Sequence, residues 1–299
     1  MGIVGLQKFV LLALFGLAAQ LIDGALGMAY GLTSTTLLLA AGLAPAVASA
    51  SVHLAEVGTT LASGAAHWKM GNTDWRAVRW LALPGGVGAF AGATVLSNLD
   101  GDAARPWISL FLVALGAYLI VRFAFFGGKI DVRPGTLRRP LLAPLGFVAG
   151  FLDAVGGGGW GPISTPTILA SGRMEPRKVI GTVSTSEFVV AASASIGFLV
   201  SLDRSVFVLP VVIALLVGGA IGAPLAAWLV RWLHPRVLGA AVGGLIVLTN
   251  GRSLLNVAGV EGDPQIAAYV AIIAVWFAAI VVVVRGVRQE RGLNVSPAD

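Results

Sequence analysis

Two copies of one motif, AQLIDGALGMAYG at residues 19–31 and AGFLDAVGGGGWG at residues 149–161, lie 130 residues apart in this chain. Each copy carries one aspartate, Asp23 or Asp153, within an otherwise apolar stretch. When the alignment is extended nine residues beyond each copy, eight of 22 positions are identical. A repeat of this length indicates an internal duplication. We therefore predict that the chain folds as two related halves, each built around one copy of the motif.

The composition of the chain is unsuited to water. Charged residues make up 11 % of the chain and hydrophobic residues 57 %, and the mean hydropathy is +0.89, whereas a soluble domain has about 25 % charged residues. A helix needs about 20 apolar residues to cross the hydrocarbon core of a bilayer. Charge-poor runs of nearly that length or more lie at residues 6–22, 80–98, 106–121, 206–230, 236–250 and 265–284. No alternating pattern typical of a membrane β-barrel occurs, so we predict an all-α polytopic membrane protein.

The distribution of Lys and Arg predicts how the two halves are oriented. Short cytoplasmic loops collect these residues, so the basic loops at 67–79 and 171–178 are predicted to be cytoplasmic. The segment 46–66 then runs inward and its counterpart 177–200 runs outward. The halves are therefore predicted to be inverted relative to each other. Inverted halves with short, Gly-interrupted segments at matching positions are typical of a transporter with a central binding site.

Short apolar pieces flank each motif, as at residues 32–44. A helix of that length reaches only about 20 Å, less than the hydrocarbon thickness, so we predict broken or re-entrant helices at the centre. We predict four units, with a cytoplasmic C-terminus: a first transmembrane repeat at 1–126, a cytoplasmic linker at 127–140, a second transmembrane repeat at 141–257, and an extra C-terminal transmembrane helix with its tail at 258–299.

The four consecutive glycines Gly156–Gly159 are predicted to break a membrane span, because glycine has low helix propensity. Such a break persists in lipid only where protein or water satisfies its free amides. Those amides, with the positive ends of helices beginning near Ser34 and Ser164, favour an anion. Close helix packing through G-x-x-x-G is the alternative. The candidate substrate-binding residues are Gly156, Gly157, Gly158, Gly159, Trp160, Ser164, Thr165, Gly27, Tyr30, Ser34, Thr35, Thr182, Thr185, Ser51 and His53.

Four carboxyl groups lie at apolar depth and form two repeat-related pairs. Asp23 and Asp153 are in the motifs, and the run SVHLAE ending at Glu56 aligns with TVSTSE ending at Glu187. An acidic side chain inside a membrane costs about 3 kcal/mol on insertion scales and usually marks function. We predict that the four carboxyl groups bind and release protons during transport. The alternative is a structural role, in which a neutral carboxyl is hydrogen-bonded to a helix end or a hydroxyl.

Several other function classes find no support in the sequence. The chain has no cysteine, H-E-x-x-H, G-x-S-x-G or P-loop lysine, so we expect no enzyme, no metal site and no cofactor. Its net charge of +6 is spread over short loops, so we expect no nucleic-acid partner. Arg122 and Arg252 occupy matched span ends, where reaching a lipid headgroup is favoured over contacting a substrate.

The paired motifs, each followed by a proline and then by SVHLAE or TVSTSE, resemble those of the TauE/SafE sulfite exporter family, also called TSUP or DUF81. The resemblance spans roughly residues 8–285. It implies a bacterial inner-membrane carrier with two related halves that moves sulfite, sulfoacetate, other organosulfonates or thiosulfate. The first motif departs from the family's glycine-rich pattern at Leu26 and Met28. We therefore expect the second copy to be the principal anion seat.

These observations together predict a secondary transporter that exports a small sulfur-containing oxyanion by alternating access and couples it to protons. Its expected partners are the anion (sulfite, a sulfonate or thiosulfate), protons and membrane lipids. The sequence is compatible with a homodimer and does not decide the oligomeric state. A passive anion channel, a transporter of a non-sulfur anion, and a membrane-embedded enzyme or scaffold are the alternatives. Only the transporters would move substrate against its concentration gradient.

Overall fold

A computed structural model describes residues 5–26, 28–125, 139–203, 208–229 and 235–293 of the chain. These residues form helices and no strand, which confirms the predicted all-α class. The helices are α1 (Leu6–Leu26), α2 (Tyr30–Ala40), α3 (Pro45–Lys69), α4 (Trp75–Ser97), α5 (Gly101–Phe125), α6 (Arg139–Gly156), α7 (Trp160–Ala170), α8 (Pro176–Ser201), α9 (Leu209–Leu229), α10 (Pro235–Val257) and α11 (Asp263–Leu293). Most of the predicted linker at 127–140 lies outside the described residues.

The helix lengths agree with a membrane-spanning protein. Among the described residues, six helices are long and apolar enough to cross a membrane: α1, α4, α5, α8, α10 and α11. The helices α2 and α7 have 11 residues each, which corresponds to about 16 Å, half the hydrocarbon thickness. The predicted short central helices are therefore present in both halves.

The two halves repeat the same order of helices and the same packing. α1 lies along α9, and its counterpart α6 lies along α4. Glycines at repeat-related positions allow both contacts. A Cβ at Gly88 of α4 would collide with the carbonyl oxygen of Phe147, and one at Gly218 of α9 would collide with that of Ala13. Small residues permit this close approach of helices where lipid removes the hydrophobic drive.

Equivalent helices of the two halves pack in opposite directions. Along α5 and α10, Gly116 lies against Gly243, whereas Phe123, further along α5, lies against the earlier residue Gly239. α3 and α8 also pack together. A two-fold axis perpendicular to the helices produces antiparallel pairs of this kind. The inverted orientation of the halves in the membrane stays a prediction, and this packing supports it.

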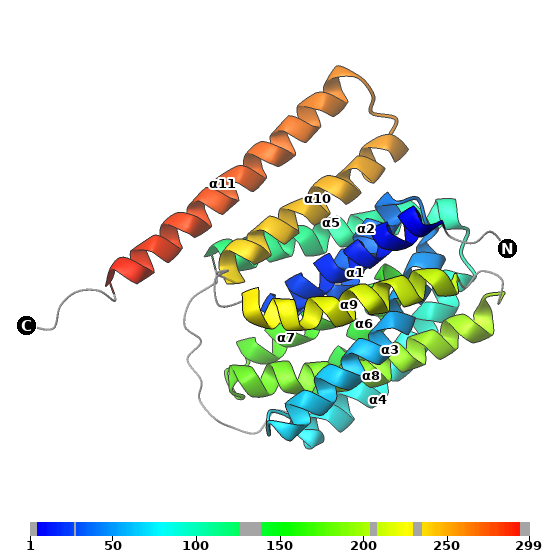
Figure 1. The fold of residues 1–299 in the computed structure, drawn as a ribbon, viewed down its shortest axis with the longest axis vertical. Helices are drawn as coiled ribbons and strands as arrows, with labels where there is room; N and C mark the ends of the chain where they lie inside the picture. Colours follow the sequence, from blue (N-terminus) through cyan, green and yellow to red (C-terminus); the bar gives the residue numbers. More distant parts are fainter. Residues whose placement is uncertain (1–4, 27, 126–138, 204–207, 230–234, 294–299) are drawn as a thin grey trace, which may run out of the picture.

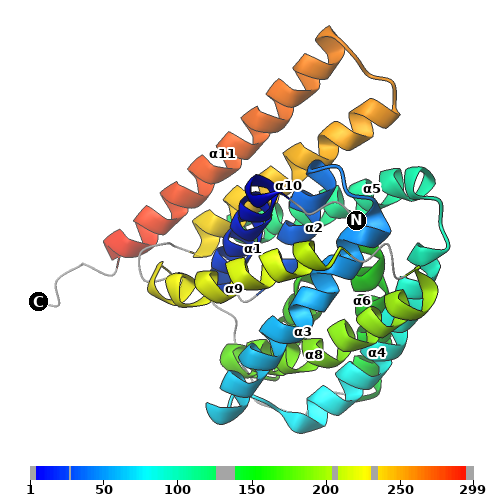
Figure 2. The same ribbon diagram turned by 45° about the vertical axis from the view of Figure 1, so that its right-hand side comes forward.

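Helix α11 has no counterpart in the repeat. It packs on α10 and α5, and it lies at one edge of the molecule while α3, α4 and α8 lie on the opposite side (Figure 1, Figure 2). Large apolar side chains along it stay exposed, including Ile266, Val270, Val275 and Phe277. An exposed apolar face of this extent fits lipid rather than water, so α11 suits a lipid-facing position at the edge of the helix bundle.

Candidate functional site

The two helix breaks, between α1 and α2 and between α6 and α7, meet in the buried interior. The backbone of Gly158 touches that of Leu32 so closely that a Cβ at Gly158 would collide with the Leu32 nitrogen. A Cβ at Gly31 would lie 3.0 Å from the carbonyl oxygen of Gly157. The hydroxyl of Thr35 donates a hydrogen bond to that same oxygen. The repeated motifs are thus brought into direct contact.

The second break has the backbone geometry that only glycine adopts freely. Gly157 has φ +66° and Gly158 has φ +158°, values that a side chain disfavours. The predicted break is confirmed, with Gly156 as the last residue of α6 and Trp160 as the first of α7. Both half-helices start earlier than predicted, because α2 and α7 begin one turn before Ser34 and Ser164. In the first break the left-handed position is held by Ala29, with φ +96°.

Asp153 occupies the anion seat that the sequence predicts for a substrate. Its Oδ1 accepts hydrogen bonds from the backbone nitrogens of Gly159 at 2.7 Å and Trp160 at 2.9 Å. In the first half Asp23 Oδ1 accepts one such bond, from Tyr30 N at 3.2 Å. Unpaired amides at a helix start attract negative charge, and here the protein supplies that charge itself. The expectation of free amides is therefore corrected: in this conformation Asp153 covers them.

His53 and Asp153 form a buried pair that must contain a proton. His53 Nδ1 lies 2.8 Å from the carbonyl oxygen of Ser49, which can only accept, so Nδ1 carries a hydrogen. The other ring nitrogen, Nε2, lies 3.2 Å from Asp153 Oδ2. Two bare acceptors would repel each other at that distance, so one proton resides on Nε2 or on Oδ2. His53 is fully buried and Asp153 is 3 % exposed, so water does not screen the pair.

The predicted proton-coupling residues gather around this pair. One ligand-type atom each of Glu56, His53 and Asp153 lie within 4.8 Å of one another. Glu56, Asp23 and Glu187 also line a common cavity of about 30 Å³, which is large enough for a water molecule. Among the described residues, no Lys or Arg lines this cavity. Its carboxyl groups therefore have no basic side chain beside them in the described wall.

The same three groups have the spacing of a metal site. Imidazole and carboxylate ligands are compatible with several divalent metals. However, Asp153 already uses Oδ1 for two amide bonds and Oδ2 for His53. We therefore interpret the cluster as a proton site.

Two aromatic residues fix the half-helices in place. Trp160 is fully buried, and its indole nitrogen donates to the carbonyl oxygen of Val183 in α8 at 3.1 Å. The Tyr30 hydroxyl donates to the carbonyl oxygen of Leu215 in α9 at 3.4 Å. Each half-helix is thereby anchored to a long helix of the second half, and Tyr30 also lines the cavity of the carboxyl groups.

The remaining candidate residues divide into two groups. Ser164 and Thr165, one turn into α7, are buried, and their hydroxyls have no hydrogen-bond partner in the described part of the chain. Thr182 and Thr185 instead bond to the α3–α4 connection. Thr182 Oγ1 accepts from the backbone nitrogen of Asp74, and the hydroxyl oxygens of Thr185 and Thr73 lie 3.1 Å apart. These two threonines therefore fasten a loop, which corrects their expected place at the centre.

Three further candidates need separate mention. Ser34 lies in the first turns of α2 and is buried, and Ser51 of α3 is buried as well. Gly27 lies outside the described residues. Sequence reasoning missed four neutral side chains that line the carboxyl cavity: Gln20, Thr59, Thr60 and Ser63. Gln20 stands inside the first motif and one turn before Asp23, and this spacing on a helix was a signal that could have identified it.

The fold and the buried centre define the chain as a polytopic α-helical membrane protein with two interrupted helices that meet in its interior. The family model for "Sulfite exporter TauE/SafE" matches residues 12–253, so the chain belongs to this family of membrane transporters. It is also 52 % identical over 281 residues to the probable membrane transporter protein YtnM of Bacillus subtilis (strain 168), an alignment that covers 93 % of each chain. No solved structure matches the chain.

Proposed function

We propose that this transporter exports a small sulfur-containing oxyanion, such as sulfite, an organosulfonate or thiosulfate, across the bacterial inner membrane by alternating access, coupled to protons. The family description supports sulfite as the substrate class. The observation that carries the coupling is the His53–Asp153 pair, which holds a proton at the point where the two helix breaks meet.

Proton binding and anion binding are linked because both involve Asp153. While Asp153 is charged, its Oδ1 holds the amides of Gly159 and Trp160. A proton that moves from His53 Nε2 to Asp153 Oδ2 neutralises the carboxyl group and weakens these charge-assisted bonds. The two amides then become available to a substrate oxyanion, and the unpartnered hydroxyls of Ser164 and Thr165 add donors nearby.

Glu56, Asp23 and Glu187 provide the next positions for that proton. They line one small cavity beside the pair, so a proton that leaves His53 or Asp153 passes to another buried carboxyl group rather than directly to water. Several buried carboxyl groups within one cavity cannot all be charged without strong repulsion, which favours a protonated member in every step.

The test is transport by the purified protein in proteoliposomes loaded with sulfite. With equal sulfite on both sides and an imposed pH gradient, we expect sulfite to accumulate on one side. A passive channel would leave the two concentrations equal, and an enzyme or scaffold would give no flux. Transport by a Glu187→Gln variant that kept its full dependence on the pH gradient would remove Glu187 from the proton path.

The identity of the anion needs a separate measurement. A ligand that binds the folded protein raises its unfolding temperature by mass action. We expect sulfite, thiosulfate or sulfoacetate to raise this temperature, and sulfate and taurine serve as comparison ligands. If all these anions fail while cations succeed, the proposed substrate class is wrong.

A further inference from the structure

A second polar cavity, of about 200 Å³, lies where α2, α5 and α10 meet. We call it the Arg105–Arg252 cavity. Its wall includes the guanidinium groups of Arg105 and Arg252, the amides of Asn250 and Asn256, and the hydroxyls of Ser109 and Ser253. Among the residues that the structure describes, no acidic side chain lines it. This is the opposite of the carboxyl-rich centre described above.

Arg105 is held in place and still has donor capacity. Its Nη2 donates to the carbonyl oxygen of Leu43 at 3.3 Å, which fixes the side chain at the end of α2. Its Nε is buried and has no hydrogen-bond partner in the described residues. A buried guanidinium nitrogen without an acceptor is costly, so an anion that enters the cavity would supply the missing acceptor.

Other groups in the wall also leave donors free. The Oδ1 of Asn256 accepts from Gln265 Nε2 of α11 at 2.9 Å, so its amide NH₂ remains for another partner. Arg252 has no ion-pair partner among the described residues. Asn250, in contrast, is buried and has no donor left: its NH₂ donates to Thr36 Oγ1 of α2 at 3.1 Å and to the Ile246 carbonyl oxygen at 3.0 Å, which holds α10 against the half-helix. The wall thus combines one anchored guanidinium group, that of Arg105, and the exposed guanidinium group of Arg252 with the amide donor of Asn256, the chemistry of oxyanion recognition.

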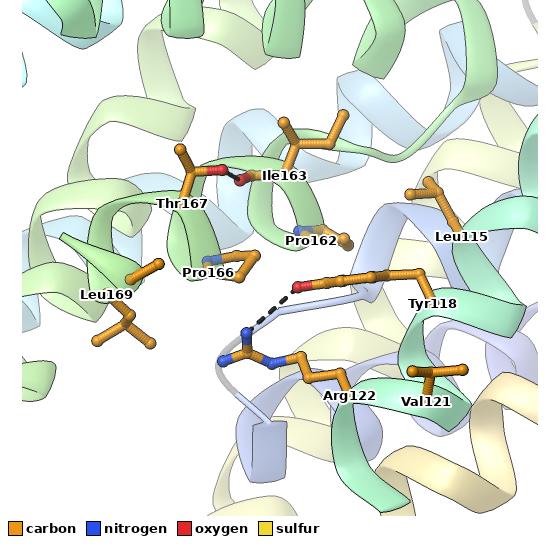
Figure 3. Close-up of a pocket in the computed structure, with 10 residues that line it drawn as sticks. Leu115, Tyr118, Val121, Arg122, Pro162, Ile163, Pro166, Thr167 and Leu169 are labelled. Carbon is orange, nitrogen blue, oxygen red and sulfur yellow. Dashed lines mark hydrogen bonds between the residues drawn. The ribbon is translucent and has the colours of Figure 1, made fainter. Parts of the chain in front are cut away.

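The repeat provides a comparison cavity with different chemistry. Thr36, Leu39 and Arg252 of the Arg105–Arg252 cavity correspond by the repeat offset to Pro166, Leu169 and Arg122, and these three line a cavity of about 750 Å³ beside α7. Its other lining residues are mostly apolar. There the guanidinium group of Arg122 donates to the Tyr118 hydroxyl at 3.2 Å (Figure 3). Arg122 is thus hydrogen-bonded inside the protein, whereas Arg252, its counterpart in the repeat, has no ion-pair partner in the described part of the chain.

We propose that the Arg105–Arg252 cavity binds a small oxyanion and is a binding station for the transported anion on one side of the membrane. This rests on the proposed function for the identity of the anion. The cavity adjoins the centre through α2, since Thr36 lines it while the neighbouring Thr35 bonds to Gly157 in the second break. By the predicted topology, the loop at 67–79 and the C-terminus are cytoplasmic. The α4–α5 and α10–α11 connections, each one helix away, are then external, so this side is the outer one. The sequence-based reading of Arg252 as a headgroup contact is replaced by this role.

The test is calorimetric titration of the purified full-length protein with sulfite, using wild type, Arg105→Gln, Arg252→Gln and the double variant. The matched control is Arg122→Gln, the same change at the repeat-related position. We expect the double variant to raise the Kd for sulfite at least roughly tenfold, because each substitution removes a charge-assisted hydrogen bond to the anion. We expect Arg122→Gln to keep the wild-type Kd. A double variant with the wild-type Kd would overturn the proposal.

Three additional arms separate the alternatives. Arg252 is exposed, so Arg252→Gln tests the cavity even if Arg105→Gln fails to fold, which its unfolding temperature would reveal. Titration after adding phosphatidylglycerol asks whether a lipid phosphate is the natural occupant; sulfite binding that is fully displaced at low lipid content would overturn the proposal. Sulfite flux in proteoliposomes is measured in parallel. If sulfite binding requires the two arginines but the wild-type protein shows no sulfite flux, the proposed function is rejected and the anion site in the Arg105–Arg252 cavity is retained.

Discussion

The two helix breaks come from one duplicated motif but differ in what their aspartates do. Asp153 accepts two backbone amides and faces His53, whereas Asp23 accepts one amide and lies in a cavity with other carboxyl groups. The repeat-related position of His53 is Ser184, which cannot hold a proton in the same way. Duplication therefore produced two similar helix breaks, and among the described residues the aspartate of the second break contacts a histidine, whereas that of the first does not.

The largest expected difference between the breaks is in transport after Asp153→Asn and Asp23→Asn. Asparagine keeps an acceptor for the amides and can donate to His53 Nε2, so the fold should persist while the proton is no longer exchanged. We expect Asp153→Asn to reduce pH-driven sulfite flux by roughly 100-fold, the lower end of the contribution of a positioned proton-transfer group. Asp23→Asn should cost clearly less. Equal losses in the two variants would mean that the breaks are functionally equivalent.

The second break should also be the less tolerant of a side chain. Gly158→Ala combines a left-handed φ with a collision against the Leu32 backbone, so we expect a loss of unfolding free energy of about 3 kcal/mol or more. The control is Gly42→Ala, where φ is +90° and no atom lies within 4 Å of the added Cβ. That variant should lose only about 1 kcal/mol. Thermal unfolding in detergent compares the two, and similar losses would show that the contact contributes nothing.

The pH dependence of transport tells whether His53 exchanges a proton or only packs against its neighbours. The proposed proton exchange takes place at the contact of His53 Nε2 with Asp153 Oδ2, so wild-type flux should depend on pH. His53→Gln should make the flux less dependent on pH and lower the maximal flux by roughly tenfold, which corresponds to about 1.4 kcal/mol. Ser184→Ala, at the repeat-related position, should keep the wild-type profile. A His53→Gln variant with an unchanged profile would leave the pair a purely structural contact.

The smallest expected effect concerns Ala29 in the first break. Its φ of +96° is costly for any residue with a side chain, so Ala29→Gly should raise stability, by less than about 1 kcal/mol because glycine loses more entropy on folding. At Gly159, its counterpart, an added Cβ would lie 3.3 Å from the ring of Phe111, so Gly159→Ala should lose a little stability where Ala29→Gly gains it. Thermal unfolding of both variants measures this. A marked loss of stability in Ala29→Gly would show that the first break needs its methyl group.

The architecture of this protein was largely predictable from its sequence. Long charge-poor runs, a repeat at constant offset and four adjacent glycines each have a local physical meaning, and they predicted the helices, the two halves and the break at Gly156–Gly159. The acidic residues at apolar depth were also predicted to matter, and the structure brings Asp23, Glu56 and Glu187 to one cavity beside Asp153.

The details of the site were less predictable, because they depend on the direction of side chains. For Asp153 the sequence offered a carboxyl group bonded to a helix end only as the alternative to proton exchange, and it did not decide between the two. The structure places the carboxylate on the amides of Gly159 and Trp160. Thr182 and Thr185 have suitable chemistry, but the packing of α8 directs them to the α3–α4 connection. The Arg105–Arg252 cavity joins residues from α2, α5 and α10, and no local pattern links segments so far apart.

The bond between the Thr35 hydroxyl and the Gly157 carbonyl joins the half-helix of one repeat to the break of the other. Neither interruption can shift without displacing its neighbour, since their main chains also rest on each other. The two halves are therefore in contact at their interruptions, and we expect a displacement of one half-helix to be transmitted to the other half of the molecule.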